Sequence, residues 1–176
     1  MRRRLAPLLG IAALAMLSAA ALPAFADDAA DKPIELTPLQ IGQIFCIAIV
    51  GNDMAPVEAL TTASLQKAIA KADALNTVWM KKNPDEKPPL GDGLPWQEHA
   101  DYASGCTAKN PTDTGKEARV DLTYHYPEAP DADYTNTLVL KPVPNPEMGD
   151  NFWRIDDIAF DNGSGMKQDM IDAFKP

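Results

Sequence analysis

The chain has 176 residues, a length typical of one domain, with 25 acidic and 16 basic residues and a formal charge of −9. Such an acidic surface repels nucleic-acid phosphates and anionic lipids, so the composition argues against both as partners and favours cationic ones. The roughly 150 residues that follow the first 26 can bury a substantial core, so folding needs neither a metal nor a dense set of disulfides.

The first 26 residues have the pattern of a secretory signal peptide. Three arginines precede an apolar run over 5–22, and Ala24-Phe25-Ala26 then fits a small-x-small cleavage site. The alternative is an N-terminal membrane anchor, because the apolar run nearly reaches membrane-spanning length. Pro23 and the cleavage pattern favour removal after Ala26, which would leave 13 basic and 25 acidic residues and a formal charge of −12. We therefore expect a bacterial protein that is periplasmic or secreted, with no membrane association after cleavage.

Cys46 and Cys106 are the two cysteines of the chain. Export places them in an oxidising compartment, where an even count favours a disulfide, and two buried free thiols are the alternative. A bridge closing a loop of about 60 residues would stabilise the fold by roughly 4 kcal/mol in the chain-entropy model. A catalytic thiol is not expected, since it would need a neighbouring base or cation.

Two long helices are expected in the first half of the chain. Residues 27–36 form an acidic, flexible leader, after which Thr37, Pro38 and Gln40 make a capping box. The helix that follows is predicted to end at Gly51. It is apolar nearly all round over 44–50, so we expect it to be buried on several sides.

A short turn or helix is expected over 56–60, and Thr61 or Thr62 then caps the second long helix. Apolar residues recur in it at helical spacing and predict a buried stripe of Leu65, Ala68, Ile69, Ala72, Leu75 and Trp79. Residues 83–95 hold four prolines and two glycines and predict an irregular loop. Residues 96–104 are expected to be partly helical.

Three strands are expected in the second half, over 116–126, 134–143 and 151–160. The first alternates, with inward positions at Val120, Leu122, Tyr124 and Tyr126. The third contains the sequence WRIDDIAF, in which the alternation slips at Asp156-Asp157. The slip predicts a β-bulge that allows Trp153, Ile155, Ile158 and Phe160 all to face the core.

A terminal helix completes the chain, with Ser164 as its expected N-cap and Met166, Met170, Ile171 and Phe174 along one side. Consecutive strands joined by turns favour antiparallel pairing, and one polar face per strand indicates a sheet covered on one side. The sequence thus predicts a single α+β domain over 37–176, in which a curved antiparallel sheet packs on the N-terminal helices.

Four features together carry a resemblance: the leading helix pair, LTTASLQKAI at 60–69, KPPLGDGLPW at 87–96, and a late WRIDDI strand followed by a short helix. They resemble exported bacterial proteins of the DUF3828 type, which are placed in the NTF2-like, cystatin-like superfamily. The resemblance covers most of residues 37–174. It implies a cone, formed by a bent sheet around a helix, with a pocket at its open end. It implies no particular activity, because that superfamily includes isomerases, dehydratases, transport factors and immunity proteins.

His99 and His125 are the chain's two histidines. No H-E-x-x-H motif or Cys/His cluster accompanies them, so no metal site and no cofactor are expected. Strand alternation places His125 on the outward, solvated face. His99 either lines a pocket or, as is favoured, packs in its loop or is simply exposed. No serine lies in a G-x-S-x-G motif, which leaves a serine triad without support.

Several acidic residues are candidates for a site. Glu128, Asp131 and Asp133 either bind calcium or form a solvated turn, and the solvated turn is favoured. Enzymes of the superfamily place a general base inside an apolar cone, so the resemblance offers Asp157 and Tyr124 as catalytic candidates. The favoured alternative is a bulge whose carboxylates lie outside or bond to backbone amides.

The Pro/Gly-dense loop is the expected recognition element. Its high content of proline and glycine predicts a shaped, rigid segment. Its candidate binding residues are Pro88, Leu90, Asp92 and Trp96. We predict an exported binding module, of the immunity type or directed at an envelope protein, with catalysis disfavoured. Small-molecule binding or cofactor-independent catalysis in the cone interior is the alternative. A homodimer formed through the sheet face is a third possibility.

Overall fold

The structure is a computed structural model that describes residues 35–91, 93–99, 101–146, 149 and 151–175. The predicted signal peptide and nearly all of the leader lie outside these residues. Within them, no helix combines the length and the apolar character needed to cross a membrane.

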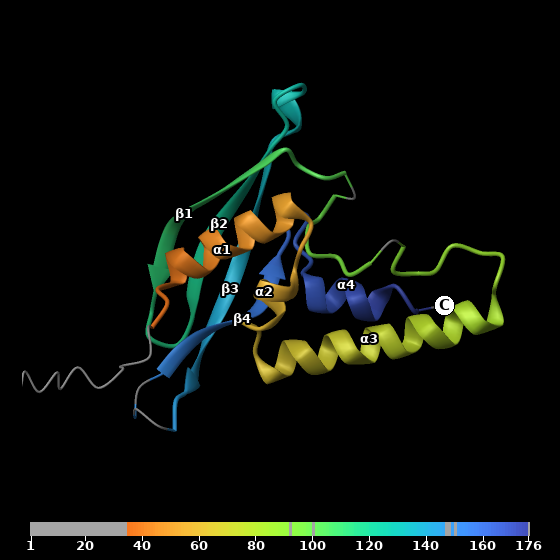
Figure 1. The fold of residues 1–176 in the computed structure, drawn as a ribbon, viewed down its shortest axis with the longest axis horizontal. Coiled ribbons are helices and arrows are strands. Elements are labelled where there is room, and N and C mark those ends of the chain that lie inside the picture. Colours follow the sequence, from red (N-terminus) through yellow and green to blue (C-terminus); the bar gives the residue numbers. More distant parts are fainter. Residues whose placement is uncertain (1–34, 92, 100, 147–148, 150, 176) are drawn as a thin grey trace, which may run out of the picture. The chain divides into compact units, whose positions relative to one another are not determined.

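In the described part of the chain, three α-helices precede a sheet and one follows it, and a 3-10 helix, η1 (Pro130–Ala132), lies between two of the strands (Figure 1). The helices are α1 (Pro38–Gly51), α2 (Ala55–Glu58), α3 (Ala63–Lys82) and α4 (Met166–Asp172). The strands are β1 (Gly105–Asp113), β2 (Ala118–His125), β3 (Tyr134–Pro144) and β4 (Asn151–Ala159), which form one antiparallel sheet in the order β1-β2-β3-β4. The predicted α+β class is confirmed.

The start of α1 has the predicted capping box. The Gln40 amide donates to Thr37 Oγ1 at 3.3 Å, and the Thr37 amide donates to the Gln40 side-chain oxygen at 2.8 Å. The helix includes Gly51 and is capped one residue later than expected by Asn52, whose φ of 52° is left-handed. α1 then lies across β1 and β2 on the inner face of the sheet (Figure 1).

The prediction that α1 is buried on several sides is wrong. Ile41, Phe45 and Ile49 are buried against the sheet, but Ile47 is 76% exposed and Val50 is 44% exposed. The reason is geometric, because a helix resting on one face of a single sheet keeps its far side in solvent. Apolar composition does not by itself supply a second covering layer.

The apolar stripe predicted for α3 is buried over part of its length. Thr62 is the cap, with the Leu65 amide donating to its hydroxyl at 3.1 Å. Leu65 and Ala72 are buried, whereas Leu75 is 39% exposed. Figure 1 shows the reason, since α3 runs past the sheet and packs beside α4 and β4. Its distal turns also expose Val78.

The sequence-based prediction missed β1 altogether and expected partial helix over 96–104, where the described residues form bends and no helix. β1 is an edge strand whose half from Lys109 onward is exposed and polar, so it lacks an apolar alternation. Asn110 has a positive φ of 50°, and the register shifts between Lys109 and Thr112. Such irregularity with a proline is typical of sheet edges.

β4 contains the predicted bulge. Val139 pairs with Asp157 and Leu140 pairs with Ile155, so Asp156 is the extra residue. Ile155 and Ile158 are both fully buried and Phe160 is 5% exposed, while Trp153 is half-buried against the same core. The free edge of β4 is covered, because the Thr62 amide donates to the Ile155 carbonyl at 2.8 Å.

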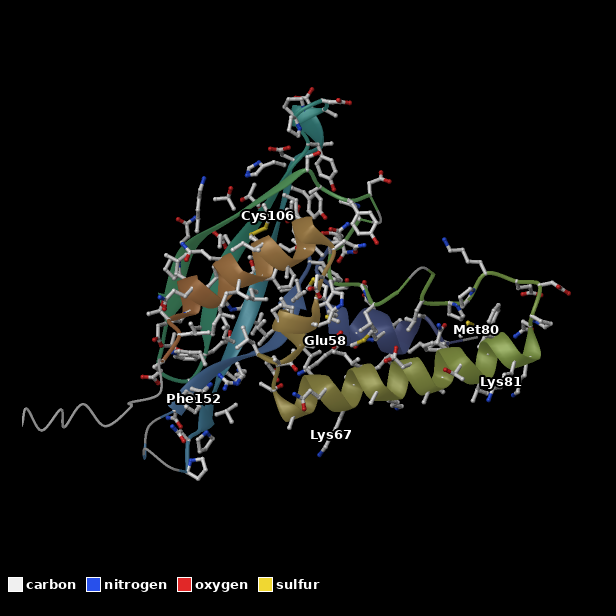
Figure 2. All side chains as sticks on the ribbon, viewed as in Figure 1. Glu58, Lys67, Met80, Lys81, Cys106 and Phe152 are labelled. Atoms are coloured by element: carbon white, nitrogen blue, oxygen red, sulfur yellow. A yellow bond between two sulfur atoms is a disulfide. The ribbon has the colours of Figure 1, made fainter. Side chains whose placement is uncertain are left out.

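The core fills the space between α1, α4 and the inner face of the sheet. Its largest fully buried side chains include Phe45, Leu122, Tyr124, Leu138 and Met170. The predicted disulfide Cys46–Cys106 is confirmed and joins α1 to β1, as the sulfur bond near the Cys106 label in Figure 2 shows.

Two expectations for the C-terminal helix are wrong. Gly165 is the N-cap residue of α4 and has no side-chain capping bond, while Ser164 lies in the preceding turn, where its amide donates to Asn162 Oδ1 at 2.8 Å. Ile171 is 49% exposed, because the apolar side of this short helix narrows to Met166 and Met170 at the core.

Candidate functional site

A groove with a volume of about 570 Å³ lies beside the Pro/Gly-rich loop; we call it the loop groove. Its walls come from the loop, the C-terminal end of α1, the α2 segment and α4. Its apolar wall consists of Ile49, Met54, Leu90, Leu94 and Trp96. Four charged residues, Glu58, Lys87, Glu98 and Asp169, also line it.

The loop is held in shape by its own bonds and by packing. The Gly91 amide donates to the Pro88 carbonyl at 2.8 Å, and the positive φ of 61° at this turn suits glycine. The Leu90 amide reaches Asn76 Oδ1 on α3 at 3.4 Å. Trp96 is 7% exposed and meets Phe45 edge-on, with ring centroids 6.5 Å apart. The groove wall is thus anchored to α1 and α3.

The Glu98 carboxylate is fixed at the groove. One of its oxygens, Oε2, accepts from the Asn136 side-chain amide and from the Asp161 backbone amide, both at 3.0 Å. The Glu98 amide also donates to Asn136 Oδ1 at 3.4 Å. Because Asn136 is buried in β3, these bonds hold the loop to the sheet. The other carboxylate oxygen of Glu98, Oε1, has no partner among the described residues.

Glu58 and Asp169 present carboxylates of a different kind. Among the residues that the structure describes, neither side chain makes a hydrogen bond or an ion pair, although both line the groove. Figure 2 labels Glu58 at the end of α2. With Glu98 and Lys87, the groove carries three carboxylates and one ammonium group.

Aromatic side chains border the same region. Tyr102 lines the groove and is 64% exposed, and His99 lies edge-on to Tyr134 with ring centroids 4.5 Å apart. The segment is held by Gln97, whose side-chain amide donates to the carbonyls of His99 at 2.6 Å and Asp101 at 2.8 Å. His99 therefore lines the groove and is at the same time exposed and packed against Tyr134, so both of its expected settings are present.

The four candidate binding residues of the loop occupy different places. Leu90 and Trp96 line the groove, whereas Pro88 is half-buried and contributes its carbonyl to the turn at Gly91. Asp92 lies outside the described residues. Two of the four are thus brought together at one cavity.

The bulge carboxylates are engaged in structural bonds. Asp156 Oδ1 accepts from the Thr62 hydroxyl at 2.7 Å and pairs with Lys167 Nζ at 2.9 Å. Asp157 Oδ1 accepts from the backbone amides of Ile158 at 2.9 Å and Lys167 at 3.1 Å. Both carboxylates therefore tie β4 to its neighbours.

A second hollow, of about 510 Å³, lies beside these aspartates; we call it the sheet hollow. Its charged residues are mostly paired with one another. Glu117 bonds Arg119 at 2.7 Å and Lys141 at 2.6 Å, and these two cations hold the pKa of the Glu117 carboxyl below its ordinary value, the Lys141 bond contributing most. The charged side chains of the sheet hollow thus have partners, whereas the buried Ser164 hydroxyl that also lines it has none among the described residues.

Tyr124, the other catalytic candidate, is fully buried. Its ring stacks on Tyr134 with centroids 4.7 Å apart, and burial raises the pKa of the Tyr124 phenol. Neither the loop groove nor the sheet hollow is lined by Tyr124. It acts here as a core residue.

His125 makes more contacts than a solvated strand histidine would. Its Nδ1 lies 2.8 Å from Asp133 Oδ2 and its Nε2 lies 2.8 Å from Thr107 Oγ1. This hydroxyl–imidazole–carboxylate order is that of a nucleophile, a base and an orienting acid. Thr107 is however paired within the β1–β2 ladder, and neither hollow is lined by any of the three residues. The chain of bonds joins β1 to the β2–β3 turn.

The acidic turn before β3 has a structural role as well. Asp133 accepts from His125 and from the Tyr126 amide at 2.8 Å, and these bonds, the histidine first, hold the pKa of the Asp133 carboxyl below its ordinary value. Asp131 and Glu128 are exposed. Among the described residues, no group of three or more histidine, cysteine, aspartate or glutamate side chains is placed to hold a metal ion.

The carboxylates of the groove were missed by sequence reasoning. Glu58, Glu98 and Asp169 belong to α2, the loop and α4, and no spacing in the sequence links them. The available signal was the composition of the loop, which indicates a shaped segment but not what lies opposite it.

Comparison with family models, with curated proteins and with solved structures found no match to this chain. The resemblance to DUF3828-type proteins therefore stays a prediction. The fold and the site define an α+β domain with one α1–β1 disulfide and a charged, apolar-walled groove beside the Pro/Gly-rich loop.

Proposed function

We propose that this chain is an exported binding module that receives a segment of a partner protein in the loop groove. The observation that carries the proposal is the groove itself. Its volume of about 570 Å³ falls within the range of ligand sites, and its apolar wall with a few placed polar groups is their usual make-up. Its openness to the surface beside the exposed Tyr102 suits a segment of a larger molecule.

Export is part of the same proposal. The signal-peptide pattern and the resemblance to DUF3828-type proteins both predict it, and a disulfide between Cys46 and Cys106 fits an oxidising compartment. We place the chain in the bacterial periplasm or outside the cell. An envelope protein is then the expected class of partner, with an immunity-type role as one form of it.

Binding is favoured over catalysis by the site chemistry. Around the loop groove, the described titratable groups do not include a nucleophile hydrogen-bonded to a base. The alternative placed a small molecule in the cone interior. That interior is occupied by side chains such as Tyr124 and Leu138, which argues against it.

Site-directed photo-cross-linking tests the proposal. A photoreactive amino acid is placed at Tyr102 on the groove rim, or at Asp121 on the outer face of the sheet, in the protein expressed in its own cell envelope. We expect the Tyr102 site to yield a discrete protein adduct. A second substitution, Leu94→Glu, should abolish that adduct because it puts a charge in the apolar wall.

The two sites act as controls for each other. Adducts from Asp121 with none from Tyr102 would move the binding surface to the sheet and overturn the proposal. So would a Tyr102 adduct that persists undiminished in the Leu94→Glu protein, once circular dichroism has shown that this protein is folded.

A further inference from the structure

We propose that the segment bound in the loop groove presents a basic side chain, lysine or arginine, next to an apolar side chain. This inference rests on the proposed function and names the chemistry that the groove selects. The charged residues and the apolar residues of the groove support it separately.

The residues that line the loop groove carry more negative than positive charge. Among the described lining residues, Glu58, Glu98 and Asp169 supply three carboxylates against the one ammonium of Lys87, in a chain whose formal charge is −9. An anionic segment would meet repulsion both at long range and at the wall. A cationic one is attracted at both distances.

The hydrogen bonds of these carboxylates show which of them can accept a bond from a ligand. Glu58 and Asp169 make no hydrogen bond or ion pair within the described part of the chain, so each can accept from an incoming donor without losing a partner. Glu98 is different, since Asn136 and Asp161 hold its Oε2 in place and leave Oε1. One carboxylate is therefore pre-positioned, and a charge-assisted bond to it costs little ordering.

The apolar wall of the groove explains why a simple metal or ammonium ion is not the expected occupant. Met54, Leu90 and Leu94, which are half-buried, offer apolar surface that only an organic ligand covers. The alkyl stem of lysine or arginine packs on such a wall while its charged end reaches the carboxylates. The exposed ring of Tyr102 can in addition stack with a guanidinium group.

The sheet hollow is also charged, but its carboxylates already have bonding partners. There Glu117 is bonded to Arg119 and Lys141, and Asp156 to Lys167 and Thr62. A ligand charge would have to displace an existing pair. The contrast assigns the cationic segment to the loop groove.

Fluorescence anisotropy with four labelled hexapeptides tests the inference. The peptides share a leucine-flanked centre, which is lysine, arginine, norleucine or glutamate. We expect the lysine and arginine peptides to bind about tenfold more tightly than the norleucine peptide, and the glutamate peptide to bind most weakly. Raising the salt concentration should narrow these differences, because the groove is open to solvent.

Charge-removing variants locate the effect. Glu58→Gln and Asp169→Asn should each weaken the lysine peptide by about threefold to tenfold and leave the norleucine peptide unchanged. Glu128→Gln makes the same change in net charge at an exposed position away from the groove, and should alter neither affinity. Unfolding midpoints establish that all three variants are folded.

The results that overturn this inference differ from those that overturn the proposed function. Equal affinity for the lysine and norleucine peptides, or equal loss in Glu128→Gln and Asp169→Asn, would refute the basic-segment chemistry. Absence of binding by all four peptides at millimolar concentration would refute it as well. The role of the groove in partner recognition is decided separately, by the Tyr102 cross-link.

Discussion

At the residue scale, neighbouring carboxylates have separate tasks. Asp156 is the bulged residue of β4 and receives both the Thr62 hydroxyl and the Lys167 ammonium, whereas Asp157 bonds backbone amides. Thr62 is also the N-cap of α3. The bulge thus does more than restore the apolar alternation, because it joins the start of α3 and the start of α4 to one strand.

Replacing Asp156 should therefore be costly. Asp156→Ala removes the carboxylate that bonds both the buried Thr62 hydroxyl and the Lys167 ammonium, and we expect a loss of about 1–3 kcal/mol in the free energy of unfolding. Urea denaturation measures it. Glu128→Ala, at an exposed turn position, should change the same quantity by less than about 0.5 kcal/mol. Equal effects in the two variants would contradict the structural role of Asp156.

Asp133 gives a prediction about pH. Its folded pKa lies below the ordinary value, chiefly because of the His125 bond, so its stabilising contribution is present above the unfolded pKa and is lost as the pH falls through the folded pKa. Asp133→Asn should accordingly be less stable than the unaltered protein at pH 7, and the difference should shrink below about pH 4.

Urea midpoints measured from pH 7 down to pH 2.5 check this dependence. Asp131→Asn, two residues away in the same exposed turn, serves as the control and should track the unaltered protein throughout. A gap for Asp133→Asn that widens with acid would show the opposite sign and refute the assignment.

At the scale of elements, the contact between α1 and the sheet depends on one glycine. A Cβ atom built on Gly42 would lie 2.8 Å from Val120 Cγ1 and 3.0 Å from Ala108 Cβ, inside the packed core. Overpacking of this kind costs about 1–3 kcal/mol. Alanine in a helix interior gains at most about 1 kcal/mol over glycine.

We therefore expect Gly42→Ala to lower the free energy of unfolding. Gly51→Ala, at the end of the same helix, meets nothing within 4 Å and should leave stability unchanged or slightly raised. The thermal unfolding midpoints of the two variants compare the steric cost of the Cβ atom at position 42 with the gain from the higher helix propensity of alanine. A stabilised Gly42→Ala protein would mean that α1 lies farther from β2 than described.

The disulfide gives the second prediction at this scale. Cys46 and Cys106 are 60 residues apart in sequence and join α1 to β1. Cys46→Ala combined with Cys106→Ala should lower the free energy of unfolding by roughly 4 kcal/mol, a large fraction of the stability of a typical domain. Titration of denatured, unreduced protein from an oxidising compartment should find no free thiol. Two reactive thiols would refute the bridge.

The sequence predicted the elements whose signal is local. The capping box at Thr37, the alternation of β2 and the slip at Asp156 each depend on a few adjacent residues, and each is present. β1 was missed because an edge strand with Pro111 and an exposed second half lacks alternation. The exposure of Ile47 was missed because it depends on how many layers cover α1, which no local pattern records.

At the scale of the whole described domain, the two charged hollows have opposite characters. In the sheet hollow, charged side chains such as Glu117 and Lys141 pair with one another, whereas the loop groove combines an apolar wall with two carboxylates, Glu58 and Asp169, that have no partner among the described residues. Sequence reasoning identified one wall of the groove through Leu90 and Trp96. The opposite walls come from α1, α2 and α4, so they required the tertiary structure.

Amide chemical-shift mapping with the lysine hexapeptide tests the central claim most directly, because it locates binding on the isotopically labelled protein. We predict shift changes at Leu90, Leu94 and the Trp96 indole, extending to Asp169, with the outer face of the sheet unchanged. Shift changes confined to Arg119 and Lys141 in the sheet hollow, or none at all at saturating peptide, would contradict the claim that the loop groove is the binding site.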